Sequence, residues 1–125
     1  MVQSNLGQGR MQMLKSANRL KKRKEFAYLY NNGKAKHSNY LTLVYLPTKH
    51  RPLKIGFSIS KKIGKAHTRN LIKRRLRAIV REQVPNLLDN YNAVFIAKTG
   101  IENLSFADLR KNVLYLLDNS ELKKC

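Results

Sequence analysis

The chain has 125 residues, of which 42% are hydrophobic, and a formal net charge of +19. This length supports one domain with one core, and the apolar fraction excludes wholesale disorder. Residues 1–81 hold 21 of the Lys and Arg residues and a single acid, Glu25, whereas residues 82–125 hold 5 basic and 6 acidic residues. The first two thirds of the chain therefore carry the positive charge, and a nucleic acid is the first partner to consider.

The only cysteine is Cys125, so no intrachain disulfide can form, which fits a reducing cytoplasm. The N-terminal residues contain no apolar h-region, and no run of apolar residues is long enough to cross a membrane. The basic helix described below lacks the Trp and Phe anchors of interfacial helices, which argues against a membrane-surface role. We expect a cytoplasmic protein with no membrane partner.

We predict three parts along the chain: a flexible basic tail over residues 1–19, a single domain over 20–120 and a C-terminal tail over 121–125. The domain begins with a short helix over residues 21–32. Its apolar residues recur at helical spacing and are Phe26, Leu29 and Tyr30. The pair Asn32-Gly33 then predicts a left-handed helix end.

Two apolar segments predict strands in the first half of the domain. Residues 40–46 are β-branched and aromatic, and residues 53–60 alternate, with Leu53, Ile55, Phe57 and Ile59 on one face. Because only residues 48–52 join them, we expect the two strands to form an antiparallel hairpin. A third strand is possible in the 35–47 region, and residues 93–98 predict a further strand.

Residues 61–81 contain nine Lys or Arg residues and no acid, yet apolar residues run through the segment at helical spacing. We predict a helix over 66–83 that Pro85 closes. On a helical wheel the apolar positions fall within an arc of about 100°: Ile72, Leu76, Ile79 and Val80. The opposite arc holds Asn70, Lys73, Arg74, Arg77 and Arg81. Arg69 lies between the two arcs.

A last helix is predicted to start after Ser105, since Asp108 stands three residues further on in a pattern similar to a capping box. Its apolar stripe contains Leu109, Val113, Leu116 and Leu117. The element order is then helix, two or three strands, helix, strand, helix.

The basic helix suits a polyanion that is bound in a fixed geometry. Lys and Arg neutralise phosphates, Arg adds forked donors, and a helix N-terminus at residues 66–70 adds backbone N–H groups. Asn70 can hydrogen-bond a sugar or a base edge. The alternative is a solvated basic face without a fixed partner, which nine like charges without any acid make unfavourable.

The string from Ser60 to Arg77 closely resembles the signature of the bacterial ribonuclease P protein subunit, S-K-K-x-G-x-A-x-x-R-N-x-x-K-R-x-x-R. The matching positions are Ser60, Lys61, Lys62, Gly64, Ala66, Arg69, Asn70, Lys73, Arg74 and Arg77. One departure is Leu71, where members often have a second Arg. The resemblance covers roughly residues 15–120.

The resemblance implies a single-domain α/β (α+β) two-layer sandwich in the order αβββαβα, with about four strands. It also implies an unusual left-handed βαβ crossover that contains the basic helix, against the usual right-handed rule. The residues themselves support only the element order.

The resemblance further implies that the protein binds the catalytic RNA of ribonuclease P, with one protein per RNA. The positions carried over for this contact are Lys61, Lys62, Gly64, Asn70, Lys73, Arg74, Arg77 and Arg81. The RNA would cleave precursor tRNA with bound Mg²⁺, and the protein itself would hold no cofactor or metal.

A second group of positions is implied to form a cleft for the single-stranded 5′ leader of precursor tRNA: Phe26, Tyr30, Val44, Phe57 and Arg69. Aromatic side chains stack on unpaired bases without sequence preference, although simple core packing is the usual role of such residues. Val44 stands where some members have Tyr, which moves one contact to Tyr40 or Tyr45 or removes it.

We find no catalytic constellation in the sequence. His37, His50 and His67 are not at metal-ligand spacing, and no phosphate-binding loop or nucleophile elbow occurs. The alternatives are a ribosomal or other structural RNA-binding protein, a DNA-binding module that uses residues 66–83 as a recognition helix, and a self-sufficient nuclease. The alternating strand before residue 61 argues against a helix-turn-helix.

Overall fold

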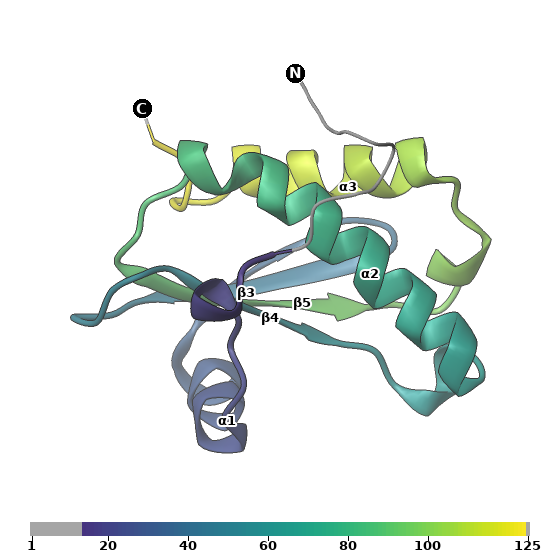
Figure 1. Cartoon of the computed structure of the whole chain (residues 1–125), viewed down its shortest axis with the longest axis horizontal. Coiled ribbons are helices and arrows are strands. Elements are labelled where there is room, and N and C mark those ends of the chain that lie inside the picture. The colour runs from purple at the N-terminus through teal and green to yellow at the C-terminus, as the bar shows by residue number, and fades with distance from the viewer. Residues whose placement is uncertain (1–13, 125) are drawn as a thin grey trace.

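A single four-stranded sheet, in the order β2-β3-β5-β4, organises the part of the chain that the computed structural model describes, residues 14–124 (Figure 1). The strands are β2 (Lys34–His37), β3 (Leu41–Pro47), β4 (Lys54–Ser58) and β5 (Tyr91–Ala97). The helices are α1 (Arg23–Asn32), α2 (Ala66–Gln83) and α3 (Phe106–Asp118). The mixed α/β class and the predicted order αβββαβα are confirmed.

The predicted hairpin between β3 and β4 is wrong, because β5 lies between these two strands. It pairs antiparallel with β3 and parallel with β4, and it connects to β4 through α2. Ala93, Val94 and Phe95 of β5 are all fully buried, so both faces of this strand need cover and it takes a central position. The left-handed sense of the crossover stays a prediction.

The sheet has a main core on one face and a smaller core on the other. Helices α2 and α3 cover the first face, and α1 alone lies on the second (Figure 1). The main core includes the predicted stripes of α2 and α3, all buried: Ile72, Leu76, Ile79, Val80, Leu109, Val113, Leu116 and Leu117. The smaller core contains Leu20, Leu29, Val44 and Val94, with Phe26 packed against it. Both functional surfaces considered below rest on these two cores.

Residues 14–19 are packed against the domain, contrary to the expectation of a flexible tail up to residue 19. Leu14 is fully buried in the main core, and the Asn18 side-chain amide donates to the Leu53 carbonyl at 2.8 Å. The Leu20 amide donates to the Ile55 carbonyl at 3.0 Å. This segment therefore covers the free edge of β4, which would otherwise expose unpaired backbone groups. The rest of the predicted tail, residues 1–13, lies outside the described residues.

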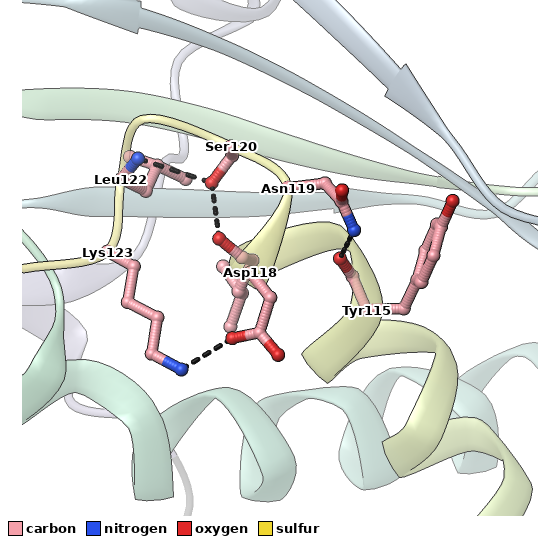
Figure 2. A network of polar contacts seen from close by, with 7 residues as sticks. Tyr115, Asp118, Asn119, Ser120, Leu122 and Lys123 are labelled. Carbon is pink, nitrogen blue, oxygen red and sulfur yellow. Dashed lines mark hydrogen bonds and ion pairs between the residues drawn. The ribbon is translucent and has the colours of Figure 1, made fainter.

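The C-terminal residues also belong to the packed domain rather than to a tail. Leu122 is fully buried, and its carbonyl accepts a hydrogen bond from the Leu88 amide at 2.7 Å. Ser120 accepts from the Leu122 amide, and Lys123 pairs with Asp118, which fixes the turn after α3 (Figure 2). The predicted boundary at residue 121 therefore moves to the end of the described chain.

Glu121 ties this C-terminal turn to the sheet edge. Its carboxylate accepts from the Lys34 ammonium at 2.7 Å and from the Tyr45 hydroxyl at 3.3 Å. The hydrogen bond from Lys34 holds the pKa of Glu121 below its usual value. The pair is exposed, so its role is to set the position of the chain end rather than to supply much stability.

The predicted left-handed helix end at Gly33 is wrong, since its backbone is extended (φ −80°, ψ 160°). Glycine is needed here for space. A Cβ at this position would lie 2.6 Å from Cγ1 of Val44 and 2.8 Å from the Leu29 carbonyl oxygen. Gly33 thus lets the chain pass from α1 directly into β2 along the sheet surface.

Gly56 of β4 provides the space in which α1 packs against the sheet. A Cβ there would lie 2.5 Å from Cζ of Phe26 and 3.1 Å from Cβ of Leu20. The missing side chain in β4 therefore fixes how close Phe26, and with it α1, approaches the sheet.

We predict that Gly56→Ala lowers the free energy of unfolding by about 1–3 kcal/mol, because the added methyl group overlaps the Phe26 ring. Chemical denaturation of the variant measures this cost. In a Phe26→Leu background the same substitution should cost clearly less, since the ring is gone. Equal costs in the two backgrounds would contradict the proposed packing of the Phe26 ring against Gly56.

Candidate nucleic-acid interface

Helix α2 presents a basic surface because its apolar stripe is anchored in the main core. The helix has the predicted bounds, and a one-turn 3-10 helix with Pro85 at its centre follows it. Before α2, the 3-10 turn Lys61–Ile63 buries Ile63 and leaves Lys61 and Lys62 exposed. Strand β4 precedes this turn, so the helix-turn-helix alternative is excluded.

We define the basic face as the positions that the sequence predicted for RNA contact: Lys61, Lys62, Gly64, Asn70, Lys73, Arg74, Arg77 and Arg81. Lys61, Lys62, Asn70 and Arg74 are exposed, and the other four are half-buried. Within residues 14–124, no ion pair involves any residue from 61 to 77. The positive charge of this stretch is therefore not compensated by the protein's own carboxylates.

The N-terminal end of α2 adds to this positive field. Its first turn has no acidic residue, and the N-cap residue Lys65 makes no side-chain cap. The aligned peptide dipoles therefore leave a partial positive charge beside Lys61 and Lys62.

Arg69 lies at the edge of the basic face, as its place between the two arcs predicted. Its Nε donates to the Gly64 carbonyl at 3.1 Å, and the side chain is half-buried. This hydrogen bond holds Arg69 against the turn that leads from β4 into α2. The side chain is thus fixed in place at the start of α2.

Arg77 is the least satisfied residue of the basic face. Its Nε is buried and has no hydrogen-bond partner within the described part of the chain. Burial and the proximity of Arg19 lower the pKa of Arg77 below its usual value. Arg19 was not predicted as a site residue, because it was expected in the flexible tail. It instead forms a β-bridge with Ile55 of β4. The like charges of Arg19 and Arg77 therefore repel each other, and we call the region of these two residues the corner of Arg19 and Arg77.

The predicted leader-binding residues are divided between the two faces of the sheet. Phe26 and Tyr30 lie together on α1, with ring centroids 6.5 Å apart, and Val44 lies in the smaller core beside Phe26. Tyr30 is 48% exposed, whereas Val44 is only 7% exposed. Tyr30 thus offers an open ring face, with Phe26 and Val44 as its support.

Phe57 does not belong to this cleft, which corrects the prediction. Its ring stacks on Phe95 at 6.0 Å in the main core, on the face that α2 and α3 cover. The alternation of β4 already places Phe57 on the same side as Ile55, and this parity is the signal that could have excluded it. Tyr45 is also wrong as a replacement for Val44, because it is 1% exposed in the same core. Tyr40 packs against this core as well.

Residues 14–124 contain no group of three or more His, Cys, Asp or Glu side chains placed to hold a metal ion. In the same part of the chain, no helix is both long and apolar enough to cross a membrane. The chemistry that the described surfaces offer is binding of a polyanion and stacking on flat rings.

We predict that Arg77→Met raises the free energy of unfolding by about 1 kcal/mol in buffer without phosphate or sulfate. The substitution removes an unsatisfied buried donor and a repulsive neighbour of Arg19 while it keeps the apolar stem. Arg74→Met is the matched control and should change stability by less than about 0.5 kcal/mol, since Arg74 is exposed. A clear loss of stability in Arg77→Met would show that Arg77 makes a stabilising contact.

Comparison with known proteins places this fold and its basic helix in one class, the small α+β subunits of a tRNA-processing ribonucleoprotein. The family model for Ribonuclease P matches residues 14–121. The ribonuclease P protein component of Streptococcus pneumoniae is 34% identical over 104 residues, which cover 83% of this chain and 85% of that protein.

Two solved structures are similar in fold. The ribonuclease P protein of Staphylococcus aureus superposes with a TM-score of 0.81 at 23% identity, over 87% of this chain and all of that chain. The ribonuclease P protein of Thermotoga maritima, solved in complex with 1-(4-fluorophenyl)-2-thiourea, gives a TM-score of 0.77 at 25% identity, over 82% of this chain and all of that chain.

The chain belongs to the ribonuclease P protein family. Proteins of this family are components of the ribonuclease P holoenzyme, an endoribonuclease of tRNA processing that includes an RNA partner. The suspected family and the fold class of the sequence analysis are confirmed.

Proposed function

We propose that this protein binds the catalytic RNA of ribonuclease P through the basic face and the 5′ leader of precursor tRNA through the α1 side of the sheet. In this way it promotes endonucleolytic removal of the leader and formation of the mature tRNA 5′ end. The observation that supports this best is the separation of two chemically distinct surfaces. One is the basic stretch of residues 61–81, which contains no acid, and the other is the exposed ring of Tyr30 on α1.

The basic face suits the phosphate backbone of a folded RNA. Lys61, Lys62 and Arg74 are exposed and form no ion pair within residues 14–124, so each can replace a counterion at a phosphate. At the corner of Arg19 and Arg77, a phosphate oxygen would supply the acceptor that the buried Nε of Arg77 lacks. The binding energy is thus electrostatic and tied to the fixed line of α2.

The α1 side suits a single strand. Tyr30 offers a stacking surface for a base, and Phe26 holds the ring pair at a fixed tilt of 47°. From there a strand would run over the open part of the sheet towards Arg69, at the start of α2 (Figure 1). Arg69 would then neutralise a phosphate of the leader.

In this proposal the protein positions two RNAs and the catalytic RNA cleaves the phosphodiester bond with bound Mg²⁺. One protein binds one RNA subunit in the cytoplasm. Because cations between two polyanions relieve their repulsion, the protein should also lower the Mg²⁺ concentration that cleavage requires.

Cleavage of a 5′-extended precursor tRNA at low Mg²⁺ tests the proposed function. We expect activity only when the catalytic RNA and the protein are both present, with the cut at the mature 5′ end. Activity of the protein alone would show a nuclease site in this chain. Tight RNA binding without stimulation would assign it to the structural RNA-binding proteins.

Substitutions on the two surfaces should have separate effects. Arg74→Ala should weaken binding to the catalytic RNA and reduce the slope of log affinity against log salt by about 1. Tyr30→Ala should leave that binding unchanged and weaken binding of leader-bearing substrate by about 5- to 150-fold, since stacking on one base contributes about 1–3 kcal/mol. Lys111→Ala and Tyr115→Ala, both exposed on α3, are the matched controls.

The wild-type protein should lose about 10³–10⁵ in affinity for the catalytic RNA between 50 and 200 mM salt, if ~6–10 phosphates are contacted. Titrations at several salt concentrations measure this slope. A flat salt response, or equal losses of Arg74→Ala and Tyr30→Ala for both RNAs, would rule out the two-surface proposal.

A further inference from the structure

Helix α1 has a second flank, which faces a groove that the leader-binding surface does not include. Tyr28 lies on this flank, is 61% exposed, and is turned away from Phe26 and Tyr30 by the helical repeat. The groove has a volume of about 410 Å³, within the usual range for small-ligand sites. It is lined by Lys24, Glu25, Tyr28, Leu29, Leu46, Pro47, Thr48, Lys49, His50 and Asn92.

The groove is lined by apolar, aromatic and basic side chains. Leu29 is buried, Leu46 and Asn92 are half-buried, and Tyr28 is exposed. Lys24 and Lys49 are exposed at the rim, from α1 and from the β3–β4 connection respectively. An aromatic ring, an amide and two ammonium groups are the partners that a base, its polar edge and its phosphates require.

The one acid of the groove does not oppose this assignment. Glu25 is half-buried, and its carboxylate lies 3.8 Å from the ammonium of Lys54 on β4. Lys54 therefore offsets the negative charge of Glu25. The rim therefore keeps a surplus of positive charge.

The β3–β4 connection that forms the far wall is held in place. The Thr48 amide donates to the Asn90 carbonyl at 2.8 Å, and the Thr48 hydroxyl accepts from the His50 amide at 3.2 Å. Arg51 pairs with Asp89 on the neighbouring loop. The groove thus exists before a ligand binds, which reduces the ordering cost of binding.

We propose that this groove binds one unpaired nucleotide of an RNA strand, with the base on Tyr28 and the adjacent phosphates on Lys24 and Lys49. The inference rests on the proposed function, because it adds a second RNA contact on the opposite flank of α1. The nucleotide comes either from the leader of precursor tRNA or from a single-stranded segment of the catalytic RNA, and the two sources share this chemistry.

The test compares five variants with the control Tyr115→Ala as full-length proteins: Tyr28→Ala, Tyr28→Phe, Lys49→Gln, Tyr30→Ala and Arg74→Ala. Affinity is measured for two probes: the catalytic RNA alone, and precursor tRNA bound to the assembled holoenzyme. Circular dichroism and thermal unfolding verify that each variant is folded, which we expect because Tyr28 is exposed and alanine favours helix.

We expect Tyr28→Ala to lose about 5- to 150-fold in affinity for one of the two probes, and the probe affected identifies the source of the nucleotide. Tyr28→Phe should keep most of the affinity because the ring remains. Lys49→Gln should reduce the salt slope for the same probe by about 1.

Wild-type affinity of Tyr28→Ala for both probes would overturn the inference. If Tyr30→Ala is still defective in that experiment, the proposed function stands without the second groove. If Tyr30→Ala and Arg74→Ala also bind both probes like the wild type, the proposed function itself fails.

Discussion

The burial of β5 on both faces is the constraint on which the rest of this structure depends. Val94 and Phe95 are adjacent and point to opposite sides of the sheet, and both are fully inaccessible to solvent. Each face therefore needs its own cover, which α2 and α3 supply on one side and α1 on the other. Because each cover is amphipathic, each leaves a polar outer surface. The two separate surfaces that we propose for RNA thus follow from one central strand.

Local patterns in the sequence were sufficient to predict the helices and most of their buried residues. The period of Ile72, Leu76 and Ile79 gave α2 its bounds and its orientation, and Ser105 accepts the Asp108 amide as the capping pattern predicted. The segments of β3 and β5 were found from their apolar and β-branched composition and that of β4 from its alternation, whereas the exposed β2 was predicted only as a possible strand. In each case the signal lies within one element.

Long-range features were not predictable in the same way. A short connection suggested that β3 pairs with β4, but the strand that separates them comes more than thirty residues later in the chain. Leu14 lies in a segment without a clear helix or strand pattern, so nothing local shows that it enters the core. Gly33 fits a helix-end rule, yet the close approach of Val44 determines its conformation. Phe57 shows a conflict between two signals. The alternation of β4 placed its side chain on the same side as Ile55, whereas the resemblance placed it in the leader cleft.

Most acidic residues of the chain form ion pairs within the domain, away from the proposed RNA-binding positions. Glu82, Asp89 and Glu121 pair with basic residues of other segments, and Asp118 pairs with Lys123 within the turn after α3. Glu25, the one acid of the first 81 residues, pairs with Lys54 and so links α1 to β4. Most of these acids thus connect elements of the domain, whereas residues 61–77 contain no acid. At the corner of Arg19 and Arg77, the buried Nε of Arg77 has no acceptor within residues 14–124, and the charge of Arg19 repels it. Such a cost in stability is expected where a surface is shaped for a ligand that brings the missing negative charge.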